Sequence, residues 1–517
     1  MGASTRRYPA LIEALRAPAV YPHPVAEVEL VETHISWVLL AGERVYKLKK
    51  PVDLGFLDFT TLARRRFFCR EEVRLNRRLA PDTYLGVVEI KGTARRPRLG
   101  GAGRTLEVAV EMRRLPGDRM LDRLVREGGA TPEIIDAVAT LVAGFHAGAE
   151  TGGEIDEAGA IETVRRNWTE NFAQTEGLAP DILPGSWRET LRRYVEGFLA
   201  REASRFAARV AGGHSRDCHG DLQAQHVCCT EPIQVFDCIE FNHRFRFGDT
   251  AGEIAFLAMD LERLGRGDLA LRFLNAYLDE SGDYGAVPLL DFYRAYRAVV
   301  RGKVLGFQVE ARPEMRGEAR ALFALAMSYA ERRREPRLVI TSGVMGAGKS
   351  TVARAAAVAT GAAIVRMDAV RKGLGGRPLR ARAGEEFGAG LYTPAMGERT
   401  YAEALTIAGD VIRAGWPVVV DGSFSTADQR ARARALADRL EVPFTVLWCQ
   451  APDAVIAARL RARSRDEDEI SEGRAELLAA HRAGFEAPGS EAIPVDTTRA
   501  LAAQLTAALP PVPGASR

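Results

Sequence analysis

The sequence predicts an α+β domain followed by an α/β domain with a parallel sheet. The chain has 517 residues, too many for one ordinary core. Strand-like segments around one helical segment come first, and mostly helical spacing follows as far as residue 330. After the charged break at 331–336, which ends in proline, strand-like and helical segments alternate. That alternation is typical of a parallel sheet covered by helices.

The first domain, residues 1–330, is predicted to have a small lobe at about 25–115 and a helical lobe at about 116–330. In the small lobe, alternating apolar residues and a turn at 41–43 indicate strands, and apolar spacing after residue 61 indicates a helix. The expected strands are 27–31, 36–40, 44–49, 85–90 and 105–115, and the helix is 61–79. In the helical lobe, the expected helices are 122–146, 161–173, 187–211 and 289–332, interrupted by loops and strands at 217–242.

Residues 331–336 are predicted to be a linker, 337–508 the second domain and 509–517 a disordered tail. Apolar runs of strand length alternate with segments of helical spacing throughout the second domain. The expected strands are 337–341, 363–367, 417–421 and 443–449, and the expected helices are 349–360, 400–414 and 427–439.

Composition is that of a globular protein, with 47% apolar and 27% charged residues. A net charge of +3 argues against a dedicated nucleic-acid binder. No run of 18 uncharged apolar residues occurs, so neither a membrane span nor membrane association is expected. Six scattered cysteines without metal-binding spacing suggest a reducing, cytoplasmic location, and the oligomeric state stays open.

The strongest motif is G-V-M-G-A-G-K-S, which fits the pattern G-x-x-x-x-G-K-[ST] between a predicted strand and a predicted helix. Glycines allow backbone N–H groups to approach phosphates, the lysine reaches the outer phosphates and the serine hydroxyl binds Mg²⁺. The predicted ATP-binding residues are Gly343, Val344, Met345, Gly346, Ala347, Gly348, Lys349, Ser350 and Thr351.

Three further features belong to this second site. Asp368 follows a strand, where a carboxylate can deprotonate an acceptor hydroxyl, and Arg371 can hold an anionic group; a helix cap and a surface arginine are the alternative. Asp421 ends an apolar strand and is a candidate Mg²⁺ partner. The arginines of R-L-R-A-R-S-R, Arg459 and Arg463 among them, either cover the transferring phosphoryl group or form a solvated helix end.

Residues 337–500 resemble small-molecule P-loop kinases of the AAA type, close to gluconate-kinase-like and polynucleotide-kinase-like proteins. The resemblance rests on G-V-M-G-A-G-K-S-T, M-D-A-V-R-K and V-V-V-D-G-S-F. It implies ATP-dependent phosphorylation of a hydroxyl group, with Asp368 as the base.

The first domain carries H-G-D-L-Q-A-Q-H-V, followed by V-F-D-C-I-E-F-N. A loop carboxylate, Asp221, and a second carboxylate 16 residues later, Asp237, suit phosphoryl transfer: one orients the acceptor hydroxyl and the other holds Mg²⁺. The two segments resemble the aminoglycoside-phosphotransferase-like kinases, which are relatives of protein kinases, and imply a two-lobed fold.

That resemblance implies a lysine on the strand R-V-Y-K-L-K-K for the α- and β-phosphates and a glutamate partner on the next helix. Lys47 and Lys49 point to the same face of the strand, and we favour Lys47. Glu72 is favoured over Glu71 as its partner. Asp249 is expected to brace the catalytic loop.

His226 departs from the family pattern, which has asparagine as a second metal ligand five residues after the catalytic aspartate. An imidazole suits Mn²⁺ or Zn²⁺ better than Mg²⁺. His226 is therefore a metal ligand, a hydrogen-bond partner of Asp221 or Asp237, or a packing residue in a weakly active site. Gln223 or Gln225 is an alternative source of a ligand oxygen.

The whole chain resembles bacterial fusions of an aminoglycoside-phosphotransferase-like domain with a P-loop kinase domain. The resemblance implies a bifunctional, ATP-dependent phosphotransferase that uses Mg²⁺, with Mn²⁺ possible at the first site. We expect a small, sugar-like hydroxyl acceptor. The alternatives are a nucleotide-sensing regulatory protein with one weak module, and 5′-hydroxyl polynucleotide kinase activity in the second half.

Overall fold

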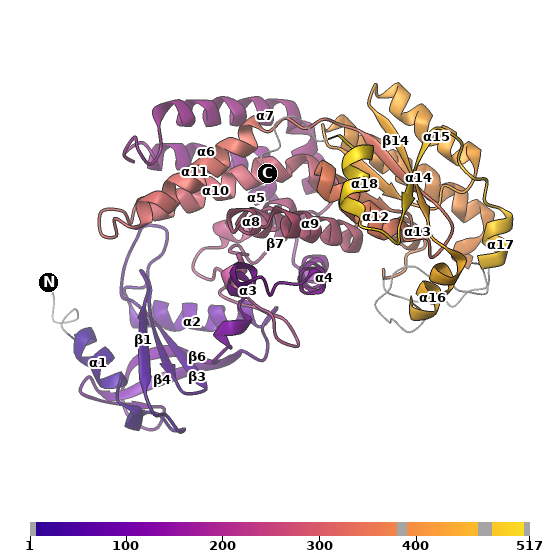
Figure 1. The fold of residues 1–517 in the computed structure, drawn as a ribbon. Coiled ribbons are helices and arrows are strands. Elements are labelled where there is room, and N and C mark those ends of the chain that lie inside the picture. Colours follow the sequence, from indigo (N-terminus) through magenta and orange to yellow (C-terminus); the bar gives the residue numbers. More distant parts are fainter. Residues whose placement is uncertain (1–6, 380–389, 464–477, 511–517) are drawn as a thin grey trace. The chain divides into compact units, whose positions relative to one another are not determined.

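The computed structural model describes residues 7–379, 390–463 and 478–510, and Figure 1 shows their fold. The chain forms two compact units. Unit 1 consists of Met1–Ala137, Phe145–Asn167 and Arg201–Gly265, and unit 2 consists of Val138–Gly144, Trp168–Ala200 and Arg266–Arg517. The helices after Gly265 therefore share a compact unit with the second predicted domain, although the sequence placed a boundary at residues 331–336.

Unit 1 contains a six-stranded sheet in the order β1-β2-β3-β6-β4-β5, with every neighbouring pair antiparallel. A tight turn at Gly42, with φ +58°, joins β2 to β3 as the sequence predicted. The strands are β1 Val28–Glu32, β2 Ser36–Ala41, β3 Arg44–Lys49, β4 Tyr84–Thr93, β5 Arg96–Leu99 and β6 Thr105–Arg113. The sequence did not identify the short strand β5.

Two helices pack their apolar residues against strands of this sheet. Leu11, Ile12 and Leu15 of α1 (Arg7–Leu15), a helix that the sequence analysis missed, share a core with strand residues. Cys69 and Val73 of α2 (Leu62–Asn76) share a second core that includes residues of β3 and β6. Helix α2 begins at the Thr61 cap, whose hydroxyl accepts the Arg64 N–H.

Two predicted helices are wrong in length, because each is broken in the structure. The segment 122–146 divides into α3 (Leu121–Glu127) and α4 (Pro132–Gly148). Gly128 adopts φ +75° to end the first, and Pro132 starts the second, where its missing N–H costs nothing. The segment 289–332 similarly divides into α10 (Leu290–Gly306) and α11 (Met315–Glu331). The remaining helices before the second sheet are α5 Glu154–Gly159, α6 Ile161–Gln174, α7 Gly185–Ala211, α8 Thr250–Arg263 and α9 Gly267–Ser281.

Unit 2 contains a five-stranded sheet in the order β12-β13-β11-β14-β15, and all its neighbouring strands are parallel. The predicted fold class, an α+β region followed by an α/β region with a parallel sheet, is confirmed. The strands are β11 Leu338–Ser342, β12 Ala363–Arg366, β13 Val418–Asp421, β14 Phe444–Gln450 and β15 Ala492–Asp496. The helices are α12 Lys349–Thr360, α13 Met367–Leu374, α14 Pro394–Arg413, α15 Ala427–Arg439, α16 Asp453–Arg463, α17 Leu478–Ala483 and α18 Leu501–Ala508.

The core of the parallel sheet explains why α9 belongs to unit 2. Helices α12 and α18 share one apolar core with central strands of the sheet, and Leu271 of α9 packs against it. The Asn275 amide of α9 accepts the Ile364 N–H at 2.8 Å and donates to the Ala362 carbonyl at 3.3 Å. Helix α9 thus supplies hydrogen-bond partners to the edge strand β12. The first residue of the predicted tail, Leu509, is buried in the same core, and residues 511–517 lie outside the described residues.

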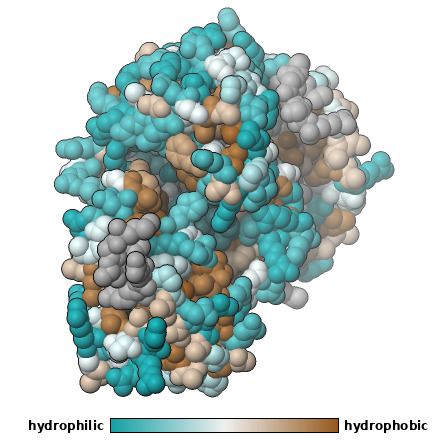
Figure 2. Space-filling model, turned by 90° about the vertical axis from the view of Figure 1, so that its left-hand side faces the viewer, coloured by the Kyte–Doolittle hydropathy of each residue, from teal (hydrophilic) through white to brown (hydrophobic). Residues whose placement is uncertain are grey.

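The face drawn in Figure 2 is largely hydrophilic, with hydrophobic residues in separate patches. In the described ranges, no helix combines the length and the low polarity that crossing a bilayer requires.

Candidate active sites

The first site is built on a loop that joins β7 (Ser215–Asp217) to a short helical turn, Ala224–His226. His219 is buried, and its Nε2–H donates to the Phe236 carbonyl at 3.0 Å, while Nδ1 accepts the Asp221 N–H at 3.4 Å. Burial lowers the pKa of His219 to about 3, so the ring is neutral and Nδ1 can accept. His219 therefore shapes the loop and is not available as a base.

Two further features hold this loop through its backbone. Gly220 has φ +86°, and a Cβ there would lie 2.9 Å from the Phe245 carbonyl oxygen, so glycine is required. The Glu253 carboxylate of α8 accepts the N–H groups of His219 and Gly220, each at 3.1 Å. The side chain of Asp221, on the same loop, is 29% exposed.

Asp237 follows β9 (Gln234–Val235) and has a left-handed backbone, with φ +64°. Its N–H donates to the buried Tyr84 hydroxyl at 3.1 Å, which helps to hold this unfavourable conformation. Burial alone would raise the pKa of Asp237, but Lys47 and the neighbouring His226 outweigh it and hold the pKa well below its usual range. Asp237 is therefore a carboxylate at neutral pH.

Lys47 and Lys49 of β3 both contact Glu72 of α2. Lys47 Nζ lies 2.8 Å from Glu72 Oε1 and 2.5 Å from Asp237 Oδ1, and Lys49 Nζ lies 2.6 Å from Glu72 Oε2. Lys49 also pairs with Glu240. Burial opposes the charge on Lys47, but the carboxylates of Asp237 and Glu72 raise its pKa. Its side chain is 15% exposed, whereas that of Lys49 is 1% exposed, so Lys47 is the more accessible cation.

The alternative glutamate, Glu71, makes a different contact. It pairs with Arg74 on the same helix, with Nη2 2.7 Å from Oε2. The structure therefore brings Lys47, Glu72 and Asp237 together and leaves Glu71 outside this group.

His226 lies between the two aspartates of the site. Its Nδ1 lies 2.9 Å from the Asp221 carbonyl oxygen and 3.4 Å from the Asp221 carboxylate. Its Nε2 lies 3.7 Å from Asp237 Oδ2 and 3.2 Å from the side-chain nitrogen of Gln225. The buried Gln223 amide donates to Asp221 at 2.6 Å. His226 is thus within reach of both carboxylates, as two of the three interpretations of this residue require.

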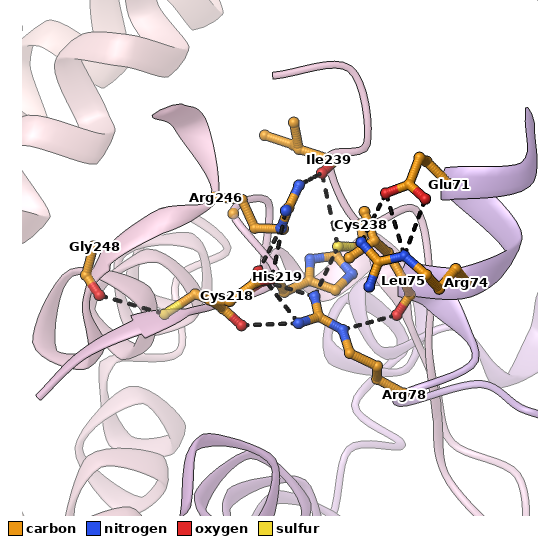
Figure 3. A network of polar contacts seen from close by, with 12 residues as sticks. Glu71, Arg74, Leu75, Arg78, Cys218, His219, Cys238, Ile239, Arg246 and Gly248 are labelled. Atoms are coloured by element: carbon orange, nitrogen blue, oxygen red, sulfur yellow. Dashed lines mark hydrogen bonds and ion pairs between the residues drawn. The ribbon is translucent and has the colours of Figure 1, made fainter. Parts of the chain in front are cut away.

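Two arginines that the sequence analysis did not identify brace the loop, and Figure 3 shows them as Arg246 above Cys218 and His219 and Arg78 below. Arg78, just after the end of α2, donates to the carbonyls of Asp217 and Cys218, each at 2.9 Å. Arg246 pairs with the Asp217 carboxylate and donates to the Ile239 carbonyl at 2.9 Å. Together they tie this loop to the segment after Asp237. No motif marked them in the sequence, since Arg246 only follows V-F-D-C-I-E-F-N and Arg78 lies at the end of the predicted helix 61–79.

Asp249 was expected to brace the same loop, but its direct partners are elsewhere. Its carboxylate caps α8 by accepting the Ala251 N–H and pairs with Arg209 of α7, with Nε 2.6 Å from Oδ2. Glu253, one turn later in α8, is instead the residue whose carboxylate accepts hydrogen bonds from the backbone of the loop that carries Asp221.

The second site lies between β11 and α12, where the motif 343–350 forms a strand-to-helix junction. Gly343, Gly346 and Gly348 have φ of +149°, +76° and +93°. A Cβ at Gly343 would lie 2.8 Å from the Cys449 carbonyl oxygen, so the close approach of β14 requires glycine there. Lys349 Nζ donates to the Val344 carbonyl at 3.0 Å across the loop. The arrangement is that of an anion cradle at a helix N-terminus.

The carboxylates predicted for the second site have identifiable partners. Arg371 of α13 donates to Asp368 at 2.8 Å, so these two predicted catalytic residues are paired. Asp421 at the end of β13 lies beside the Thr341 hydroxyl, at 3.4 Å, and Arg366 Nε, at 3.7 Å. Asp421 is buried and therefore depends on these partners.

Arg459 of α16 is anchored beside the phosphate loop. Its two terminal nitrogens donate to the Thr497 hydroxyl and carbonyl, both at 2.8 Å. The Thr497 hydroxyl in turn donates to the Ala347 carbonyl at 2.7 Å. Arg463 ends the same helix, but its side chain and the acidic run after it lie outside the described residues.

The metal residues predicted from the sequence are distributed over both sites. Asp237 and His226 lie together in unit 1, and Ser350 and Asp421 lie in the phosphate-loop region of unit 2. Across 7–379, 390–463 and 478–510, no three His, Cys, Asp or Glu side chains form a ready-made metal cluster.

Comparisons with known proteins agree with this organisation. A family model described as an AAA domain matches residues 338–488. The uncharacterized proteins Rv2004c of Mycobacterium tuberculosis and Mb2027c of Mycobacterium bovis are each 35% identical over 472 residues, which cover 90% of this chain and 92% of the relative.

Two solved structures are also similar over parts of the chain. A gluconokinase from Sinorhizobium meliloti is 24% identical, covers 34% of this chain and 91% of its own, and has a TM-score of 0.24. A choline/ethanolamine kinase family protein from Mesorhizobium loti is 13% identical, covers 62% of this chain and 98% of its own, and has a TM-score of 0.37.

Proposed function

The chain belongs to the family of the Mycobacterium tuberculosis protein Rv2004c, and we propose that it is a phosphotransferase with two ATP-dependent sites. Each site would transfer a phosphoryl group from ATP to a hydroxyl of a small metabolite, with a sugar-like acceptor preferred. The observation that carries the proposal is the position of Lys47, whose ammonium group contacts both Glu72 and Asp237. A lysine held by a helix glutamate, beside a metal-binding aspartate, is the arrangement that positions the phosphates of ATP in kinases.

At the first site, the chain supplies a base and a phosphate contact. Asp221 would accept the proton of the acceptor hydroxyl, because its carboxylate lies on a loop held rigidly by Glu253 and Arg78. Lys47 would bind the α- and β-phosphates. The oxygen donors of Asp237 fit Mg²⁺, which would neutralise charge on the phosphates when it is bound with ATP.

At the second site, the motif 343–350 would bind the phosphates through its backbone N–H groups and Lys349. Asp368 would be the base, and Arg371, which now pairs with it, would hold the acceptor or a phosphate. The Ser350 hydroxyl and Asp421 suit a hard cation such as Mg²⁺. Arg459 would act at the edge of the nucleotide site through Thr497, since both are anchored next to Ala347.

The test measures ATP consumption by the full chain against a panel of sugars and sugar acids. Asp221→Asn and Lys349→Ala are made separately, and Glu71→Gln, which alters an exposed pair beside Glu72, is the control. We expect each site variant to remove turnover on its own acceptor and to leave turnover at the other site. If neither substitution changes turnover with any acceptor, the proposal is wrong.

The same variants, with Lys47→Met added, test the two alternatives. A nucleotide-sensing first module would bind ATP without turnover, and Asp221→Asn would then leave every acceptor's turnover intact while Lys47→Met changed the rate at the second site. Polynucleotide kinase activity would transfer labelled phosphate from ATP to the 5′ end of a short oligonucleotide and would be lost in Lys349→Ala.

A further inference from the structure

The phosphate loop of unit 2 lies at the middle of one edge of the parallel sheet. Strand β11 lies between β13 and β14, and the three strands are parallel, so the segments that follow them meet at the same edge. The phosphate loop 343–350 follows β11, the central strand of the three. A chain segment that is attached to the residues after both outer strands therefore crosses the edge at which this loop lies.

The end of α17 and the residues after it are attached on both sides in this way. After β14, the carboxylate of Asp453 at the start of α16 accepts two hydrogen bonds from Arg482, one of them at 2.6 Å. After β13, the Glu486 N–H donates to the Ser425 carbonyl at 2.8 Å, and the Glu486 carboxylate accepts the Ala427 N–H at 2.6 Å. The segment therefore runs across the end of β11, from the residues after β14 to the residues after β13.

His481, the residue before Arg482, has a ring nitrogen that the protein leaves without a hydrogen bond. Its Nδ1 is buried and has no partner among the described residues. Burial, with a smaller effect of the Lys349 ammonium group, lowers the pKa of His481 to about 4, so the ring is neutral at pH 7. Since the charge of Lys349 acts on the ring, the imidazole lies near the lysine that is expected to reach the outer phosphates.

A phosphate oxygen is a suitable partner for this nitrogen. A buried polar nitrogen that finds no partner in the protein is unfavourable, and a bound ligand can supply one. A neutral imidazole can carry its proton on Nδ1 and donate it, and hydrogen bonds to charged oxygens are stronger than those to neutral ones.

We propose that Nδ1–H of His481 donates a hydrogen bond to the terminal phosphate of the nucleotide held by residues 343–350. The inference rests on the proposed function of the second site. It adds a phosphate contact from a segment about 130 positions after the loop, which no motif indicated.

The experiment compares two nucleotides that differ in the terminal phosphate. The full chain carrying Lys47→Met, which is expected to lose nucleotide binding at the first site, is titrated calorimetrically with ADP and with a non-hydrolysable ATP analogue in the presence of Mg²⁺. His481→Phe, made in this chain, keeps a planar ring but removes the donor. It should weaken binding of the analogue about tenfold and leave the affinity for ADP unchanged.

A second variant separates the hydrogen bond from the shape of the side chain. His481→Asn retains an amide N–H near the position of Nδ1, so it should keep most of the affinity for the analogue. A merely structural role of His481 would instead weaken the binding of both nucleotides.

A measurement on unchanged His481 serves if His481→Phe fails to fold. Of the eight histidines, His481 is the one that lies outside unit 1, and the Lys47→Met chain should bind nucleotide only in unit 2. In this chain labelled with ¹⁵N-histidine, nuclear magnetic resonance should show one imidazole that responds to the analogue and not to ADP. The Nδ1 signal of that imidazole should lie in the range of a protonated nitrogen.

The outcomes separate this inference from the proposed function. The phosphate contact alone is overturned by unchanged analogue affinity in His481→Phe, by an equal loss of ADP affinity, by His481→Asn binding no better than His481→Phe, or by histidine spectra that do not distinguish the two nucleotides. Binding of neither nucleotide to the folded Lys47→Met chain overturns both.

Discussion

The ammonium group of Lys47 lies 2.5 Å from a carboxylate oxygen of Asp237. This contact joins strand β3 to a residue 190 positions later in the chain, in a segment whose left-handed backbone is held by Tyr84. Lys49, two residues after Lys47, makes the same kind of contact with Glu240. The two lysines therefore attach one strand to two carboxylates of the segment after β9, and Glu72 lies between them.

The first prediction separates the roles of the two lysines. Lys47→Met should abolish nucleotide binding at the first site and change thermal stability little, because Lys47 is the partly exposed member of the pair. Lys49→Met should lower the free energy of unfolding by about 3 kcal/mol or more, because Glu72 and Glu240 lose a buried partner. Urea unfolding and nucleotide titration of both variants check this, and equal effects on stability would contradict it.

The second prediction concerns Arg78, which bonds the backbone of the loop that carries Asp221. Arg78→Lys should lower turnover at the first site about 100-fold with little change in ATP affinity, because one ammonium group cannot hold the carbonyls of both Asp217 and Cys218. Arg74→Ala, in the last turn of α2 and paired with the partly buried Glu71, is the matched control and should keep full activity. Kinetics that change only the KM for ATP would contradict a positioning role.

The third prediction tests whether α9 supports the parallel sheet. Asn275→Ala should destabilise unit 2 by about 2 kcal/mol, since the buried Ile364 N–H and Ala362 carbonyl lose their partner. Hydrogen exchange of the full chain should show faster exchange at Ile364. Thr506→Ala, at an exposed helix position of the same unit, should not change that rate. Unchanged protection in Asn275→Ala would mean that α9 does not stabilise the edge strand.

The fourth prediction is a pH dependence that depends on Asp279. Burial raises the pKa of Asp279 to about 7, although Arg366 at 3.5 Å opposes the shift. The folded protein then binds a proton that the unfolded chain releases near pH 4, so this contribution to stability is present at low pH and is lost as pH rises to about 7. In Asp279→Asn the contribution should disappear. Urea unfolding at pH 5 and pH 8 should therefore show a smaller loss of stability between the two pH values in the variant, and an equal loss in both proteins would contradict the assignment.

Local sequence patterns predicted most of the strands and both phosphate-site motifs. Two strand-like runs, 36–40 and 44–49, on either side of the turn at Gly42 specify a hairpin through neighbouring residues alone. The strand-to-helix junction at 343–350 was predictable because the glycines of the motif are the residues that can adopt the positive φ angles of this loop. The sequence analysis predicted one helix over 122–146 because apolar spacing continues past Gly128 and Pro132. The structure has two helices there, since these two residues break the helix even where the apolar period does not change.

The residues that brace the first site were not predictable in the same way. Arg78, Glu253 and Tyr84 have no motif, and each acts on a partner more than 30 positions away in the chain. The membership of α9 in unit 2 was missed for a similar reason, because Asn275 and Leu271 show their role only against β12 and the sheet core.

The sequence by itself determined the order of the two folds, the glycine loop and the candidate carboxylates, because short-range periodicity and spacing encode them. Only the tertiary structure decided that Lys47 meets Asp237, that His226 turns one nitrogen to each aspartate, and that α9 joins the second unit. Those outcomes depend on packing between segments that are distant in the chain. Buried charged and polar groups need partners there, and a local sequence pattern does not show which residues these partners are.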